Sequence, residues 1–107
     1  MLPHQKRLNP NEIKKVLNKG KKYRGEYGML ISVKANDKDS KFAFVVSKKI
    51  GNAVQRHRMT RILREITKEF NNEKSIKGVY VAFKYCDNYE ELKKEFISQY
   101  IKATGDI

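Results

Sequence analysis

The segment from residue 52 to 70 constrains the fold most, because its apolar residues fit one face of an α-helix. Placed about 100° apart around a helix axis, these residues fall within an arc of roughly 100°. The apolar arc comprises Met59, Ile62, Leu63, Ile66 and Phe70. A helix with such an arc must bury it against another element, and Asn52 after Gly51 is a suitable N-cap. The sequence therefore predicts a helix over 52–70 that packs against a domain core.

The opposite side of this predicted helix is cationic. Four side chains fall within about 60° of one another, nearly opposite the apolar arc; they are His57, Arg61, Arg64 and Lys68, and we call them the cationic ridge. A solvated helix face is usually charged too, but it normally mixes signs to gain pairs between neighbouring turns. No acid occurs from Lys48 to Arg64. This pattern favours a phosphate-binding surface over an ordinary solvated face.

The charge of the whole chain agrees with that interpretation. Lys and Arg number 24 against 12 acids, which gives a net charge of +12. Residues 1–68 carry 18 of the basic residues and 5 acids, whereas residues 69–107 carry 6 and 7. A compact domain this basic favours nucleic acid as a partner, with a membrane surface second. The first two thirds of the chain should therefore build the binding face.

Two further helices are predicted at the ends of the chain. The first begins after Asn9, which can form a capping box with Glu12. Its apolar residues follow the i, i+3, i+4 spacing of one buried face; they are Ile13, Val16 and Leu17. The last helix is amphipathic and covers 87–103, and a second capping box is expected between Asp87 and Glu90.

The intervening apolar segments predict three strands. The segments 26–35 and 41–47 are expected to form a hairpin across the polar turn NDKDSK, and 77–85 is the third strand. The order is then α-β-β-α-β-α in a single domain, residues 1–107, with helices packed against a central sheet. The predicted class is an α+β sandwich.

One basic run of the sequence resembles a known family. The run SKKIGNAVQRHR at 47–58, continued by Arg61 and by the pair Arg64 and Glu65, resembles the basic segment of the protein subunit of bacterial ribonuclease P. The opening RLNPNEIKKVLNKG at 7–20, the chain length and the order of elements fit the same family.

The resemblance implies a fold and a function. The fold would be similar to domain 2 of ribosomal protein S5, with a mostly antiparallel sheet and a left-handed β-α-β crossover made by the basic helix. The enzyme would be a ribonucleoprotein that removes the 5′ leader of precursor tRNA by endonucleolytic cleavage. Its RNA subunit carries the active site and binds the magnesium. The implied partners are ribonuclease P RNA and precursor tRNA with its single-stranded leader, and neither a membrane nor DNA.

The resemblance also assigns residues to two surfaces. The RNA-facing segment would contain Lys48, Lys49, Asn52, Arg56, His57, Arg58, Arg61 and Arg64, and Lys68 extends the ridge beyond them. The cleft for the leader would be lined by Ile13, Leu17, Ile31 and Phe44.

The chain departs from the family at both surfaces. His57 takes the place of the usual Asn, and Thr60 stands where Lys is common. Ile13 and Leu17 sit where many relatives have Phe, and Ile31 where Tyr is common. Because stacking of a base on an aromatic side chain contributes roughly 1–3 kcal/mol, the leader should bind this cleft more weakly or in a different place.

No catalytic or metal-ligating set of residues is predicted. Cys86 is the only cysteine, which excludes an intramolecular disulfide, and Asp37 and Asp39 fit a turn. The sequence has no apolar run of about 18 residues that could span a membrane, and its first thirty residues lack the apolar segment of a signal peptide, so a cytoplasmic protein is expected. Composition alone leaves three other classes open: a ribosomal or ribosome-assembly protein, a DNA-binding regulator and a membrane-surface protein. The basic run at 47–58 argues against the first of these.

Overall fold

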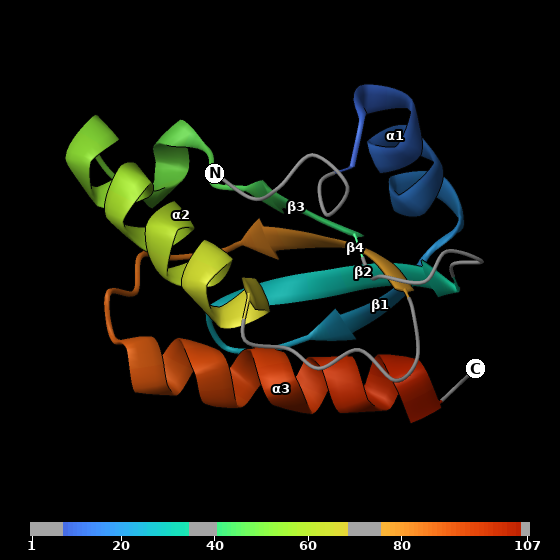
Figure 1. Ribbon diagram of the computed structural model, residues 1–107. Coiled ribbons are helices and arrows are strands. Elements are labelled where there is room, and N and C mark those ends of the chain that lie inside the picture. Colours follow the sequence, from blue (N-terminus) through green and yellow to red (C-terminus); the bar gives the residue numbers. More distant parts are fainter. Residues whose placement is uncertain (1–7, 35–40, 69–75, 106–107) are drawn as a thin grey trace.

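A computed structural model describes residues 8–34, 41–68 and 76–105, which form three α-helices, one 3-10 turn and a four-stranded sheet (Figure 1). In chain order the elements are α1 (Pro10–Lys19), β1 (Lys21–Arg24), β2 (Gly28–Lys34), β3 (Lys41–Val45), η2 (Lys48–Ile50), α2 (Ala53–Lys68), β4 (Ile76–Ala82) and α3 (Tyr89–Gly105). The predicted α+β class and order of elements are confirmed, with one added strand, β1.

The sheet has the strand order β1-β2-β4-β3 and is mostly antiparallel. β2 pairs antiparallel with both β1 and β4, whereas β3 pairs parallel with β4. Parallel neighbours cannot be joined by a tight turn and need a crossover connection. α2 is the helix between β3 and β4, so the predicted β-α-β unit built around the basic helix is present.

The predicted hairpin between segments 26–35 and 41–47 is wrong. β4 lies between β2 and β3, and the hairpin partner of β2 is β1. β1 escaped prediction because its residues, KKYR, form a mostly exposed edge strand without apolar alternation. Most of the NDKDSK turn lies outside the described residues.

The sheet buries both of its faces, but against different helices. α1 lies on one face, and α2 and α3 lie on the other, as Figure 1 shows. The larger buried cluster lies between the sheet and α2 and α3, and it includes Leu30, Phe42, Met59, Leu63, Tyr80, Leu92 and Phe96. The smaller cluster lies beneath α1 and contains Leu8, Val16, Ile31 and Val79. We call the sheet surface that carries this smaller cluster the α1 face.

α1 begins with the predicted capping box and is tied to the sheet by the same glutamate. Asn9 Oδ1 accepts a hydrogen bond from the Glu12 N–H at 2.9 Å, and Glu12 Oε1 accepts one from the Asn9 N–H at 3.2 Å. Glu12 Oε2 also lies 2.9 Å from Lys77 Nζ on β4. The Lys77 contact, more than the bond from Asn9, holds the pKa of Glu12 below its ordinary value of 4.5.

Replacing Glu12 with Gln should lower the free energy of unfolding at pH 7 by about 0.5–1 kcal/mol. The pKa of Glu12 is lower in the folded state, so its contribution is fully present above the ordinary value of 4.5 and is lost as the pH falls through the folded-state value. Urea unfolding of both proteins at pH 7 and pH 3 measures this. A difference that persists undiminished at pH 3 would contradict the role of the carboxylate charge.

α3 is capped one residue later than predicted. Asn88 Oδ1, and not the Asp87 carboxylate, accepts a hydrogen bond from a first-turn N–H, that of Glu91, at 3.2 Å. The expected capping box between Asp87 and Glu90 is therefore wrong. Asp87 is exposed instead, with Oδ2 3.8 Å from Arg58 Nη1 of α2.

Two polar side chains of α3 fix the β1–β2 hairpin to the helix. Glu95 accepts hydrogen bonds from the Tyr27 N–H at 3.0 Å and from the Tyr80 hydroxyl at 2.8 Å. Gln99 is buried, and its Nε2 donates to the carbonyl oxygens of Tyr23 at 2.9 Å and Gly28 at 3.1 Å. Gln99 Oε1 is buried without a partner among the described residues, but the hydrogen bonds of Glu95 and of Gln99 Nε2 specify one arrangement of hairpin and helix.

Candidate nucleic-acid interface

α2 begins with a second capping box, and Asn52 is its N-cap as predicted. Asn52 Oδ1 accepts a hydrogen bond from the Gln55 N–H at 2.9 Å, and Gln55 Oε1 accepts one from the Asn52 N–H at 3.0 Å. A Cβ at Gly51 would lie only 2.1 Å from Gln55 Oε1, so the absence of a side chain there permits the cap. Asn52 thus has a structural role beside the RNA contact that the family resemblance assigns to it.

The apolar arc of α2 faces the larger buried cluster. Met59, Leu63 and Ile66 are buried, and Ile62 is half-buried against the same cluster. Phe70, the last predicted member of the arc, lies outside the described residues. The arc fixes the rotation of the helix, so the ridge on its opposite side is directed away from the core.

The cationic ridge is largely exposed to solvent. His57, Arg61 and Lys68 are exposed, and Arg64 is half-buried. Arg61 and Arg64 stand one turn apart with the same charge, which destabilises the helix unless an anion binds there. The ridge can therefore contact phosphates without any rearrangement of the core.

The two arginines that flank the ridge, Arg56 and Arg58, differ in their exposure to solvent. Arg58 is exposed; its Nη1 donates to the Tyr85 hydroxyl at 3.3 Å and lies 3.8 Å from Asp87 Oδ2. The Arg58 and Asp87 side chains are 56% and 55% exposed, so the pair contributes little and leaves the guanidinium available to another anion. Arg56 is half-buried, and its Nε is a buried donor without a partner among the described residues.

Lys48 and Lys49 extend the positive surface beyond the start of α2. Both belong to η2, which packs against α2, and both are exposed. The next residue, Ile50, is buried and anchors this turn to the core. The turn therefore presents two ammonium groups beside the first turn of α2, whose N–H groups also favour anions.

The structure brings together two of the four residues expected to line the leader cleft, Ile13 and Ile31, and leaves Leu17 exposed on α1. Ile13 of α1 is half-buried, and Leu17 of the same helix is 39% exposed. Ile31 of β2 is buried beneath the helix. Phe44 does not join them. It pairs with Tyr80, and alternation along β3 directs it, like Phe42, toward α2 and α3. Phe44 is thus on the opposite side of the sheet from the α1 face.

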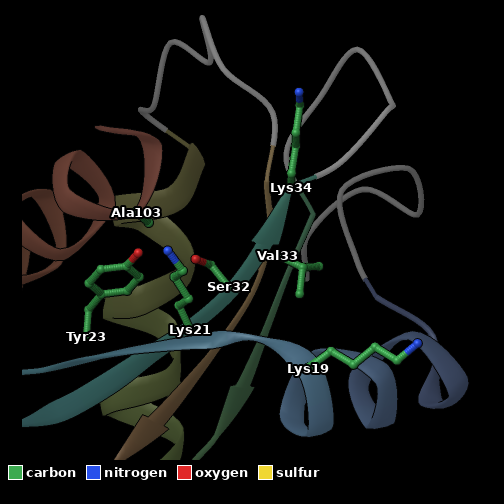
Figure 2. Close-up of a pocket in the computed structure, with 7 residues that line it drawn as sticks. All are labelled: Lys19, Lys21, Tyr23, Ser32, Val33, Lys34 and Ala103. Atoms are coloured by element: carbon green, nitrogen blue, oxygen red, sulfur yellow. The ribbon is translucent and has the colours of Figure 1, made fainter. Parts of the chain in front are cut away.

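A basic hollow at the edge of the sheet was not predicted. It measures about 360 Å³ and is lined by Lys19, Lys21, Tyr23, Ser32, Val33, Lys34 and Ala103. Figure 2 shows the Lys21 amine on the same side of β1 and β2 as Tyr23 and Ser32, while the Lys19 and Lys34 side chains extend away from it. The lysines in the KGKK sequence at 19–22 were visible in the sequence, but their grouping with Lys34 depends on the β1–β2 pairing.

Two negative findings apply to the described parts of the chain. In residues 8–34, 41–68 and 76–105, no three His, Cys, Asp or Glu side chains are grouped in a way that could hold a metal ion. Over the same ranges, no helix has the length and apolar character needed to cross a bilayer.

The thiol of Cys86 is buried, and this burial raises the pKa of the thiol.

Together these features define a small basic α+β domain whose crossover helix presents a cationic ridge. The family model described as Ribonuclease P matches residues 2–104. The ribonuclease P protein component of Fusobacterium nucleatum is 33% identical over 93 residues, covering 82% of each chain. That of Syntrophomonas wolfei is 30% identical and covers 96% of this chain and 91% of its own. The chain therefore belongs to the family of bacterial ribonuclease P protein components.

Solved structures of the family share the fold. The RNase P protein from Thermotoga maritima superposes with a TM-score of 0.74 at 21% identity, covering 86% of this chain and 92% of its own. The protein from Staphylococcus aureus gives a TM-score of 0.76 at 19% identity and covers 97% and 93%. At these identities the agreement concerns the fold alone.

Proposed function

We propose that the chain is the protein component of a ribonucleoprotein that removes the 5′ leader of precursor tRNA in the cytoplasm, and that it binds ribonuclease P RNA through α2 and η2. The observation that supports this most directly is the exposed cationic surface, which holds the ridge together with Lys48, Lys49 and Arg58. Guanidinium groups suit this task because each can grip phosphate oxygens with two parallel hydrogen bonds.

The proposed contribution of the protein is electrostatic and positional. Folded RNA brings phosphates close together, and magnesium ions must screen their repulsion. A domain of net charge +12 supplies fixed positive charge near the enzyme RNA and its substrate. The protein should therefore lower the magnesium concentration that cleavage requires. In this proposal the RNA binds the magnesium and carries out the chemistry, and the protein binds and orients.

The leader is proposed to lie on the α1 face of the sheet. Ile13 packs against the smaller buried cluster that contains Ile31, and Leu17 stands exposed one turn along α1, so these side chains are aliphatic. An aliphatic surface can exclude water from a base, but it lacks the π-face that makes aromatic stacking strong. Phe44 is not part of this proposed surface because it faces α2 and α3.

Purification of the tagged chain from its own organism, followed by sequencing of the bound nucleic acid, tests the proposal against the other classes of basic protein. We expect ribonuclease P RNA to be the most enriched species, with precursor tRNA beside it. Predominant enrichment of ribosomal RNA would favour a ribosome-assembly protein, and enrichment of DNA would favour a regulator. An Arg58→Ala/Arg61→Ala variant purified in parallel should lose most of the specific RNA.

A further inference from the structure

We propose that Phe83, with the Arg24 guanidinium over its ring, is the stacking platform on which this chain holds a base of the single-stranded leader. The inference rests on the proposed function, in which the leader lies on the α1 face. It adds an aromatic residue that the family resemblance does not assign to that surface. Arg24 lies with its guanidinium carbon 5.1 Å from the centroid of the Phe83 ring, within the range of a cation–π contact.

The strand register places this pair on the α1 face. Arg24 is paired with Met29, and Met29 is paired with Val81. Directly paired residues point to the same side of a sheet, and Met29 and Val81 both pack with the smaller buried cluster beneath α1. Arg24 therefore lies on that face, and its contact with the Phe83 ring places both side chains at the end of the sheet where β1 and β4 terminate. Lys22, two residues before Arg24, also alternates onto this side.

α1 covers only part of the α1 face and leaves this end of the sheet open. Ile31 and Val79, which pack against the helix, are 3% and 0% exposed. Phe83 is 38% exposed, as is Val45 of β3, which pairs with Val81 at the same end of the sheet. Among the described residues, several large apolar side chains are exposed, and Phe83 is the only aromatic one of them. A flat ring presented in this way is available to a ligand.

The backbone of the platform is held in place from both sides. The Phe83 N–H donates to the Tyr27 carbonyl oxygen at 2.7 Å, and the Tyr27 N–H donates to Glu95 of α3 at 3.0 Å. This chain of hydrogen bonds connects the end of β4, the β1–β2 turn and α3. A pre-ordered platform loses little conformational entropy when a ligand binds, which favours affinity.

The chemistry of the pair suits single-stranded RNA better than a peptide or a lipid. A nucleobase can stack on a phenyl ring irrespective of its identity, and a neighbouring arginine adds cation–π attraction and a contact to phosphate. Ile13, Leu17 and Ile31 provide no π-face on this surface. Phe83 would supply the π-face from the end of β4, so the leader would lie partly across that end of the sheet.

The test uses the holoenzyme reconstituted with ribonuclease P RNA and compares two ligands, precursor tRNA with its leader and mature tRNA without one. Phe83→Ala should weaken binding of the leader-bearing tRNA by about fivefold or more, the lower end of a stacking contribution. Binding of mature tRNA should be unchanged. Phe83→Leu should behave like Phe83→Ala, whereas Phe83→Trp should retain the preference for the leader, because it keeps a π-face.

Ile101→Ala is the matched control, since Ile101 is a 62% exposed apolar residue of α3 on the other side of the sheet. It should leave both affinities unchanged. If wild type prefers the leader-bearing tRNA and Phe83→Ala does so equally, the platform is wrong while the proposed function stands. If wild type shows no such preference, both the leader-binding part of the proposed function and the platform are wrong. A Phe83→Leu variant that keeps the preference would show that bulk, and not stacking, is what matters.

Discussion

An Arg58→Ala/Arg61→Ala variant should bind ribonuclease P RNA about tenfold or more weakly than the wild-type chain at moderate salt. Both guanidinium groups are exposed, and Arg58 has only weak contacts with Tyr85 and Asp87. A hydrogen bond from a charged group contributes about 1.5–3 kcal/mol where it is well formed, so losing two contacts exceeds a tenfold effect. The fold should be unaffected, because surface substitutions of this kind usually change stability by less than about 0.5 kcal/mol.

The salt dependence of binding makes this prediction specific. Each neutralised phosphate contributes about 0.7–0.9 to the slope of log affinity against log salt concentration, so the double variant should have a slope smaller by about 1.4–1.8. Filter binding or fluorescence anisotropy between 50 and 200 mM salt would measure it. Lys94→Ala/Lys102→Ala, which removes two exposed charges from α3, is the control. An equal reduction of the slope in this control would show that net charge matters and that α2 has no special role.

Replacing Phe96 with Ala should lower the free energy of unfolding by about 3–5 kcal/mol. Phe96 is fully buried, and its ring lies 5.7 Å from that of Phe42 in an edge-to-face arrangement and 5.8 Å from that of Tyr80. It connects α3 with two strands of the sheet. Truncation removes a large apolar surface and leaves a cavity that the neighbouring strands cannot easily fill.

Urea unfolding followed by circular dichroism would measure the change. Phe96→Leu is the control, because it keeps most of the volume and should cost less than half as much as Phe96→Ala. A loss below about 1 kcal/mol for the alanine variant would contradict the position of Phe96 at the centre of the larger buried cluster. The RNA affinity of the folded fraction should stay near the wild-type value, since Phe96 is buried in the core whereas the cationic ridge is on the outer side of α2.

The helices could be predicted from local patterns in the sequence. The apolar arc of α2 fixed both its existence and its rotation, because only one side of a helix can be buried in a domain of this size. The capping box of α1 was visible as Asn9 followed three residues later by Glu12. The position of Asn52 as N-cap was also predicted correctly. Each of these features depends on residues of one short continuous segment of the chain.

Features that depend on strand pairing could not be predicted from local sequence patterns. Strand β1 carries no apolar alternation, and the insertion of β4 between β2 and β3 depends on contacts far apart in the chain. The misplacement of Phe44 follows from the same limit, since the face of a strand residue depends on register. The cation–π contact between Arg24 and Phe83 likewise could not be predicted, because it forms only when the β1–β2 hairpin lies beside the end of β4.

Under the proposed function, this chain assists an RNA enzyme by supplying fixed positive charge. The most direct test is cleavage of a precursor tRNA by ribonuclease P RNA of the same organism at low magnesium, with and without the chain. We expect the RNA alone to cleave slowly and the wild-type chain to restore cleavage, while the Arg58→Ala/Arg61→Ala variant restores much less. Cleavage that stays equally slow with the wild-type chain, although high magnesium activates the RNA, would contradict this role.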